Sequence, residues 1–242
     1  MLDSKNITKF NKNAQYYDKF SVLQDEIIQY FIKFIQQQKK CSFNYACELG
    51  CGTGNLTVLL ANLFQNLNIT GIDIAEKSIN IARDKLKNYL NISLYNNNIL
   101  DFQYLDYDCI FSSMCLHWLF DDLPKFLQNF NNKNLFFAIP IENSLFDVKN
   151  KIIQLDCINT IVNFPHKNDI LDTLSIKYTI KYEIKTFTKI TNCNYALKIL
   201  KHTGIKITNN FNNIANIKKL LASNIEVDFT YEVLFIYCEY KS

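Results

Sequence analysis

Three glycines and two acidic residues are the part of this chain whose types and spacing could bind a ligand. Of the five glycines in 242 residues, three fall in the segment Glu48-Leu49-Gly50-Cys51-Gly52-Thr53-Gly54. The flanking residues predict a strand at 43–47 and a helix at 55–65. A glycine turn between a strand and a helix lets backbone approach a ligand at the positive helix end. About twenty residues later Asp73 ends another predicted strand, where an acid can hold a ribose diol.

The elements that must position this turn alternate between strand and helix as far as Pro140. Apolar periodicity predicts a helical region at 14–39, helices at 55–65, 75–89 and 123–130, and strands at 43–47, 69–73, 92–95, 109–112 and 135–139. After Pro140 the alternation breaks. The pattern there predicts strands at 175–187 and 229–240 and helices at 145–157, 168–174 and 194–202. Gly204 would cap the last of these helices. We therefore expect an α/β fold in one domain, with a parallel sheet covered by helices on both faces.

Composition limits the classes of function. Hydrophobic residues make up 48% and charged residues 20% of the chain, which predicts a sizeable core and no extended disorder. Arg83 is the sole arginine and the net charge is +3, which argues against a nucleic-acid partner. The eight cysteines form no C-x-x-C pair and are expected to be reduced, with no metal site. A polar opening segment and the lack of a long apolar run predict a cytoplasmic protein without signal peptide or membrane span.

The carboxylate beside the glycines helps to choose between nucleotide cofactors. Dinucleotide sites use G-x-G-x-x-G to seat a pyrophosphate on a helix end, whereas this segment reads E-x-G-x-G-x-G. Glu48 would repel a pyrophosphate and would suit a cationic amino group. The segment resembles the first motif of class I methyltransferases that use S-adenosylmethionine. The resemblance implies a Rossmann-like fold with a seven-stranded, mostly parallel sheet, a substrate lid insertion and S-adenosylmethionine as cofactor.

The same resemblance implies a set of cofactor contacts. Glu48 would lie near the methionine end, the turn would bring its backbone close, Asp73 would hold the ribose and apolar residues would pack on the adenine. Asn98 stands where the family usually has an acid; its amide oxygen can still accept from the adenine amino group, without the charge. Serines at the end of the fourth strand lie where ligands bind in such sheets. The expected cofactor-binding residues are Glu48, Gly50, Cys51, Gly52, Gly54, Asp73, Ile74, Asn98, Ile99 and Ser112, with Ser113 beside them.

Four further segments resemble one subfamily, the malonyl-acyl-carrier-protein O-methyltransferases of biotin synthesis. They are Phe10–Asp18 with Leu23-Gln24, Leu116-His117-Trp118, Asn143-Ser144-Leu145 and Leu200–Gly204. This resemblance implies methyl transfer to the free carboxylate of a malonyl group on acyl carrier protein, or of malonyl-CoA. A carboxylate is already ionised at neutral pH, so the reaction needs alignment and exclusion of water rather than a general base.

Four residues are candidates for orienting the substrate carboxylate. Tyr16 and Tyr17 would close over the cofactor, or else pack the N-terminal helix. Trp118 would line the acyl pocket, or else belong to the core. Lys201 would bind the carboxylate or the phosphopantetheine, or else lie on a solvated helix end. His117 is interpreted as a polar loop residue rather than as a base.

The division of the chain and three rival functions complete the expectations. Residues 1–40 would form a helical lid, 41–140 the cofactor-binding core, 141–225 a substrate lid and 226–242 the final strand, in a monomer. The rivals are methylation of another small acid or a quinone, a non-catalytic S-adenosylmethionine-binding assembly protein and a nucleic-acid methyltransferase. The last lacks an Asn-Pro-Pro-Tyr type segment for a flipped base.

Overall fold

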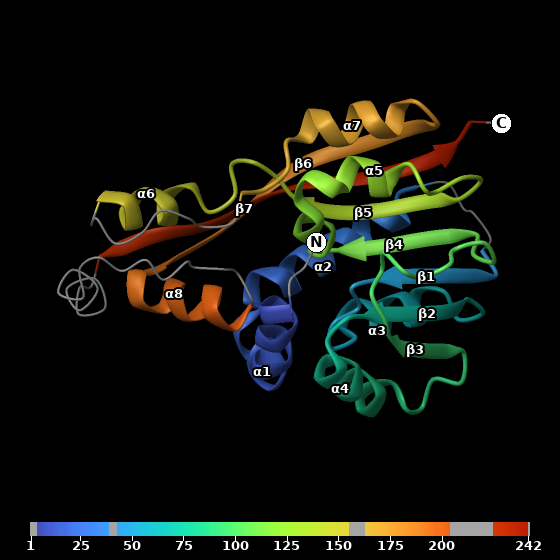
Figure 1. The fold of residues 1–242 in the computed structure, drawn as a ribbon, viewed down its shortest axis with the longest axis horizontal. Helices are drawn as coiled ribbons and strands as arrows, with labels where there is room; N and C mark the ends of the chain where they lie inside the picture. The colour runs from blue at the N-terminus through green and yellow to red at the C-terminus, as the bar shows by residue number, and fades with distance from the viewer. Residues whose placement is uncertain (1–3, 39–42, 155–162, 204–224, 242) are drawn as a thin grey trace.

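A computed structural model describes residues 4–38, 43–154, 163–203 and 225–241, and its centre is a seven-stranded sheet (Figure 1). The strands lie in the order β3-β2-β1-β4-β5-β7-β6. Their bounds are β1 Tyr45–Leu49, β2 Asn68–Asp73, β3 Ile92–Asn96, β4 Cys109–Ser113, β5 Asn134–Pro140, β6 Tyr178–Asn192 and β7 Glu226–Tyr240. The five strands expected before Pro140 are present, and the two later ones extend further than the sequence pattern predicts.

The sheet is mostly parallel, as the sequence resemblance implied. Strand β1 pairs in parallel with both β2 and β4, and β5 pairs in parallel with β4. Only β7 runs against its neighbours β5 and β6. Because β1 lies between β2 and β4, the segment after Leu49 leaves the carboxyl edge of the sheet between two parallel neighbours. Ligands bind at this edge in open α/β sheets.

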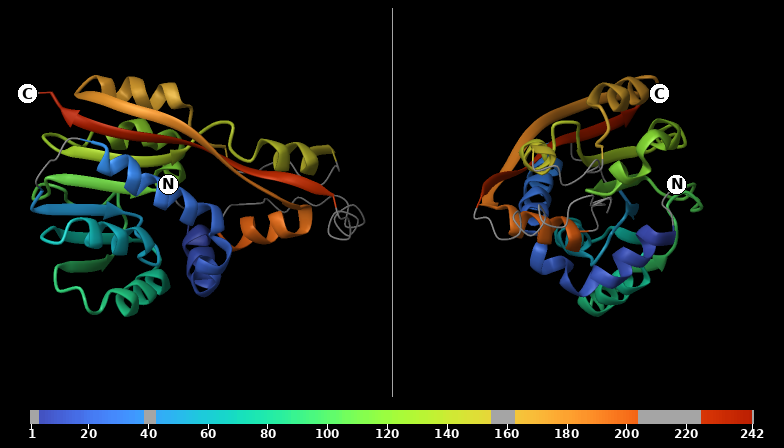
Figure 2. Two further views of the ribbon diagram at one scale, coloured as in Figure 1. Left: turned by 180° about the vertical axis from the view of Figure 1, so that it is seen from behind. Right: turned by 60° about the vertical axis from the view of Figure 1, so that its left-hand side comes forward.

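Helices cover both faces of the sheet (Figures 1 and 2). They are α1 Ser4–Phe20, α2 Val22–Gln36, α3 Asn55–Leu63, α4 Glu76–Leu86, the 3₁₀ helix η1 Leu116–Asp122, α5 Leu123–Leu127, α6 Phe146–Gln154, α7 Lys167–Ser175 and α8 Cys193–His202. The helical region expected at 14–39 is present, begins earlier at Ser4 and consists of two helices, because α1 and α2 are separated at Ser21. The Ser21 hydroxyl donates to the Asp18 carbonyl (3.4 Å), and its ψ of 28° leaves the helical range. Such back-bonding bends a helix.

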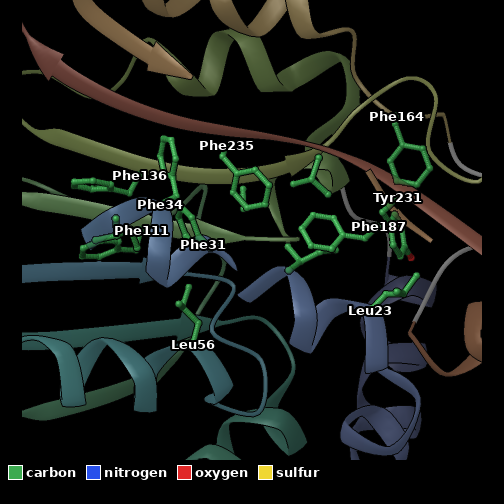
Figure 3. Close-up of a cluster of buried hydrophobic side chains, with 14 of the residues drawn as sticks. Leu23, Phe31, Phe34, Leu56, Phe111, Phe136, Phe164, Phe187, Tyr231 and Phe235 are labelled. Atoms are coloured by element: carbon green, nitrogen blue, oxygen red, sulfur yellow. The ribbon is translucent and has the colours of Figure 1, made fainter. Parts of the chain in front are cut away.

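Two apolar layers hold these helices on the sheet. One cluster joins α2 and α3 to side chains such as Phe111, Phe136 and Phe235 (Figure 3). The other cluster joins α5 and α7 to the opposite face of the sheet. Its strand residues include Ile110 and Leu135, which precede Phe111 and Phe136 in the sequence. Successive strand residues point to opposite faces, so each strand contributes to both layers. Burial on both faces explains the near-continuous apolar runs of β4 and β5 in the sequence.

Strands β6 and β7 form a long ribbon that projects past the other strands (Figures 1 and 2). They pair over their full length, from Tyr178 opposite Tyr240 to Asn192 opposite Glu226. Strand β5 pairs only with Val233–Cys238 of β7, so the beginning of β7 lies beyond the sheet. There α6 contacts β7, and α8 contacts both strands of the ribbon.

Residues 141–225 thus include β6, which is an edge strand of the main sheet, and do not form one separate layer. A lid function for the rest of that range stays a prediction, and Gly204 lies outside the described residues. Across the described ranges, no helix has both the length and the apolar character that crossing a membrane requires.

Candidate functional site

The glycine turn after β1 is held in place by the end of β2. The backbone N–H of Cys51 donates to the Ile72 carbonyl (3.0 Å), and that of Gly52 donates to Oδ2 of Asp73 (2.9 Å). The second carboxylate oxygen, Oδ1, accepts from the N–H of Ala75 at the start of α4 (2.8 Å). Each oxygen of Asp73 keeps acceptor capacity for a ligand hydroxyl. The turn and the acid that the sequence placed about twenty residues apart therefore form one unit.

Two glycines of the turn are required for different reasons. Gly50 has φ +68° and Gly52 has φ +55°, a region that strongly favours glycine. A Cβ atom on Gly50 would lie 2.2 Å from Sγ of Cys115, so a side chain there is excluded by the loop after β4. A Cβ atom on Gly52 would meet nothing within 4 Å, and Gly52 lines a cavity. The turn thus presents bare backbone to open space, as a close approach to a ligand requires.

The cavity opens at the carboxyl ends of β1, β2 and β4. Its empty volume is about 970 Å³, a figure that includes open solvent at the mouth. One half of the wall comes from the turn, from β2 and from the loop after β3, namely Gly50, Gly52, Asp73, Ile74, Asn98 and Ile99. The other half comes from α1, α2, η1, α8 and β7, and includes Tyr17, Gln24, His117, Trp118, His202 and Tyr231.

Helix α1 links the two halves and joins them to α4 and α8. Asp18 accepts a hydrogen bond from Oγ1 of Thr53 in the glycine turn (2.5 Å) and pairs with Nζ of Lys85 in α4 (3.1 Å). At the other end of α1, Nδ2 of Asn13 donates to the backbone carbonyl of Lys201 in α8 (2.8 Å). These contacts hold Tyr17 against the cavity, and a lid function for this helix stays a prediction.

Comparison with known proteins shows which family uses such a site. Residues 46–132, which contain the glycine turn, Asp73 and η1, match the family described as "Methyltransferase domain". This segment of the chain is therefore similar to a methyltransferase domain. Malonyl-[acyl-carrier protein] O-methyltransferase 2 of Ilyobacter polytropus is 29% identical over 74% of this chain and 71% of its own length. The Bacillus anthracis protein of that name is 32% identical over 50% of this chain and 45% of its own length.

Solved structures agree with the fold of this chain. The magnesium protoporphyrin IX methyltransferase of Synechocystis with bound S-adenosylhomocysteine superimposes with a TM-score of 0.61 and 15% identity, covering 92% of this chain and 86% of its own. The YcgJ protein of Bacillus subtilis gives a TM-score of 0.61 at 12% identity, covering 88% of this chain and all of its own. The Rossmann-like class I methyltransferase fold implied by the sequence is therefore confirmed.

The half of the wall that comes from the glycine turn, β2 and the loop after β3 is called the cofactor half below. It fits S-adenosylmethionine, which is the cofactor of this class. Asp73 offers carboxylate oxygens beside the bare backbone of Gly52, and Ile74 and Ile99 supply apolar surface beside them. Asn98 also lines this half, and its Oδ1 already accepts from the N–H of Leu100 (3.1 Å). An amide oxygen has a second lone pair, so the contact of Asn98 with the adenine amino group stays a prediction.

Glu48 does not line the cavity, although the motif resemblance implied that it lies near the methionine end. Its side chain is 2% exposed and accepts a hydrogen bond from Oγ1 of Thr57 in α3 (2.6 Å). Burial raises the pKa of Glu48 from its ordinary value to about 7. The structure thus places this carboxyl behind the turn, between β1 and α3, and indicates a structural role.

Five other expected residues also lie outside the wall. The Ser112 hydroxyl donates to the Leu49 carbonyl (3.0 Å), and its neighbour Ser113 faces the cavity instead. Cys51 and Gly54 are buried within the turn. Tyr16 is 44% exposed and packs edge-on against His202, and the side chain of Lys201 is exposed. Tyr17 and Trp118 do line the cavity, as expected for substrate-side residues.

Several wall residues were not singled out from the sequence. Asn13, Gln24, His202 and Tyr231 come from four elements that are distant along the chain and converge only in the fold. The available signal was the resemblance of two segments to the subfamily: the opening segment includes Asn13 and Gln24, and the segment Leu200–Gly204 includes His202. His117, interpreted as a polar loop residue, is instead 4% exposed and lines the cavity.

Proposed function

We propose that the protein is an S-adenosylmethionine-dependent carboxyl O-methyltransferase that methylates malonyl-acyl carrier protein, an early step of biotin synthesis. Two observations support this proposal together. The likeness to a malonyl-[acyl-carrier protein] O-methyltransferase extends over 74% of the chain. The cavity also has a second half, lined by residues such as Gln24, His117 and Trp118, which under this proposal receives the acyl group.

The reaction asks little acid–base chemistry of the protein. The bound cofactor supplies an activated methyl group, and the substrate carboxylate is ionised at neutral pH. Burial lowers the pKa of His117 to about 3, so this ring is neutral and poorly suited to abstract a proton. What remains for the chain is to align a carboxylate oxygen with the methyl group and to exclude water. Under this proposal that function falls to helix α1 and to the aromatic rings of Tyr17 and Trp118, which line the cavity.

The partner under this proposal is an acyl carrier protein bearing a malonyl group, with malonyl-CoA as a smaller surrogate. The side chain of Lys201 is exposed, and the next two residues, His202 and Thr203, line the cavity. Lys201 is therefore a candidate contact for the phosphate of the pantetheine arm at the mouth, rather than for the carboxylate inside.

A labelling experiment tests the proposal. Purified protein is incubated with malonyl-acyl carrier protein and methyl-labelled S-adenosylmethionine, and we expect a labelled ester that mild base removes. The matched control is malonyl-acyl carrier protein whose terminal carboxylate has already been converted to a methyl ester, and it should take up no label. A base-stable product would indicate transfer to carbon or nitrogen, and binding without turnover would indicate an assembly protein. Growth without biotin of cells lacking the first biotin-pathway methylation would support both reaction and substrate.

A further inference from the structure

Unsatisfied polar atoms gather in the half of the cavity that lies outside the cofactor half and is called the substrate half below. Among the described residues, five buried side-chain nitrogen or oxygen atoms have no hydrogen-bond partner, and four of them belong to residues in this wall. They are Oε1 of Gln24, Oγ of Ser113, Nδ1 of His117 and Nδ1 of His202. Gln24 and His117 are each only 4% exposed. Leaving such an atom unpaired costs about 1–3 kcal/mol, so the cluster indicates polar groups that a ligand satisfies.

Three of these residues come from elements next to the cofactor half. Ser113 ends β4, the parallel neighbour of β1, and His117 follows four residues later in η1. Gln24 lies in the first turn of α2 and reaches the same cavity from the other side. The ring of His117 is 5.0 Å from that of Trp118 and 5.5 Å from that of Phe164. The subsite therefore consists of polar atoms set among fixed aromatic rings.

The substrate half of the wall carries no formal charge at neutral pH. No lysine or arginine is among the wall residues that the structure describes, and the one acidic residue, Asp73, belongs to the cofactor half. The other titratable wall residues are Tyr17, Cys115, His202 and Tyr231. The nearest cation that the contacts identify is Lys149, whose ammonium lies 5.2 Å from the centroid of the Phe164 ring, the same ring whose centroid lies 5.5 Å from that of His117.

We propose that Gln24, Ser113 and His117 form a charge-neutral subsite that binds the reacting carboxylate of the acyl substrate through N–H and O–H donors, without an ion pair. The assignment rests on the proposed function, since it names the groups that receive its substrate. His117 donates from Nδ1 in its neutral tautomer, and Ser113 donates from its hydroxyl. Rotation of the terminal amide of Gln24 presents its NH₂ group in place of the oxygen.

A neutral subsite has a catalytic advantage over an arginine or lysine clamp. The negative charge of the carboxylate disappears as the methyl group is transferred and a neutral ester forms. An ion pair would stabilise the ionised reactant more than the transition state and would slow the reaction. Neutral donors orient the carboxylate oxygen and reduce its nucleophilicity less than an ion pair would. They also release the uncharged ester, to which they can donate only weakly.

Substitution of His117 tests the subsite, with the exposed His166 as matched control. His117→Phe keeps the aromatic packing and removes the donor, whereas His117→Gln keeps a neutral N–H. Calorimetry on protein loaded with S-adenosylhomocysteine measures the affinity for malonyl-CoA and for its methyl ester. We expect His117→Phe to weaken malonyl-CoA binding by about 10- to 100-fold, with partial recovery in His117→Gln. The affinity for S-adenosylhomocysteine and the behaviour of His166→Phe should not change.

The outcomes separate this proposal from the proposed function. Equal malonyl-CoA affinity in wild type and His117→Phe would overturn the subsite even if wild type turns over. Binding that depends on His117 without any turnover would sustain the subsite and overturn the proposed activity. A protonated, ion-pairing His117 would make the ratio of wild-type to His117→Gln affinity rise as the pH falls from 8 to about 5. The neutral subsite predicts a flat ratio over that range, because burial keeps the pKa of His117 near 3.

Discussion

Glu48 allows the sharpest test of where this structure departs from the motif. The carboxyl is 2% exposed, lies behind the glycine turn and accepts a single side-chain hydrogen bond, from Thr57. Replacement by glutamine in Glu48→Gln keeps an oxygen for Thr57 and removes the ionisable group. If Glu48 is structural, the variant should be more stable than wild type at high pH and should bind the cofactor normally.

The magnitude follows from the pKa of Glu48, which burial raises from 4.5 to about 7. Between these values the folded protein keeps a proton that the unfolded chain has released, so this group makes stability fall as the pH rises. The loss is small at pH 5 and complete above pH 7, where it amounts to roughly 3 kcal/mol. Glutamine does not ionise, so its stability does not depend on pH in this way. The free energy of unfolding of Glu48→Gln relative to wild type should therefore rise by about 2–3 kcal/mol between pH 5 and pH 8.

Urea unfolding of both proteins at pH 5, 6.5 and 8 measures this difference directly. Glu26→Gln, at an exposed position of α2, serves as the control and should stay within about 0.5 kcal/mol of wild type at each pH. A Glu48→Gln variant with no gain at pH 8 and a cofactor affinity reduced tenfold or more would refute the reasoning. That result would mean that an ionised Glu48 faces the methionine end, as the motif resemblance implied.

Three further predictions concern the cofactor half. Gly54→Ala should cost about 1–3 kcal/mol in urea unfolding, because φ is +84° and the new Cβ would lie 3.0 Å from Cδ1 of Leu86; an unchanged midpoint would contradict this. Asp18→Ala removes the contacts of α1 with Thr53 and Lys85 and should weaken S-adenosylhomocysteine binding by about 2- to 10-fold in calorimetry; unchanged affinity would show that α1 does not close over the cofactor. Asn98→Asp should strengthen that binding several-fold if residue 98 accepts from the adenine, and weaker binding would argue against the contact.

The part of the fold that local patterns determine was predictable from sequence. The clustered glycines marked the turn between β1 and α3, and alternating apolar segments marked the parallel strands. The division of the N-terminal helical region at Ser21 had no periodic signal in the sequence, because it depends on one serine hydroxyl that donates to the Asp18 carbonyl. The extra length of β6 was missed because it depends on pairing with β7, a partner more than thirty residues away.

The candidate site divides in the same way. Gly52, Asp73 and Ile74 belong to the local turn and strand end, and the structure places them in one wall as expected. Glu48 was assigned by position in the motif, but strand register fixes which way a side chain points, and this one points into the interior. Gln24 and Tyr231 could not be assigned from the sequence, because only tertiary packing brings α2 and β7 to the carboxyl edge of β4.

The central claim is that the bare backbone at Gly52 and the carboxylate of Asp73 form a site for S-adenosylmethionine. Calorimetric titration of the wild-type protein with S-adenosylhomocysteine tests it most directly, with Gly52→Ala as the variant that places a methyl group in the open space of the cavity. We predict saturable heat in the wild type, clearly weaker binding in a folded Gly52→Ala, and no heat from NADH. Tight NADH binding with no response to S-adenosylhomocysteine, or equal affinity in both proteins, would contradict the account.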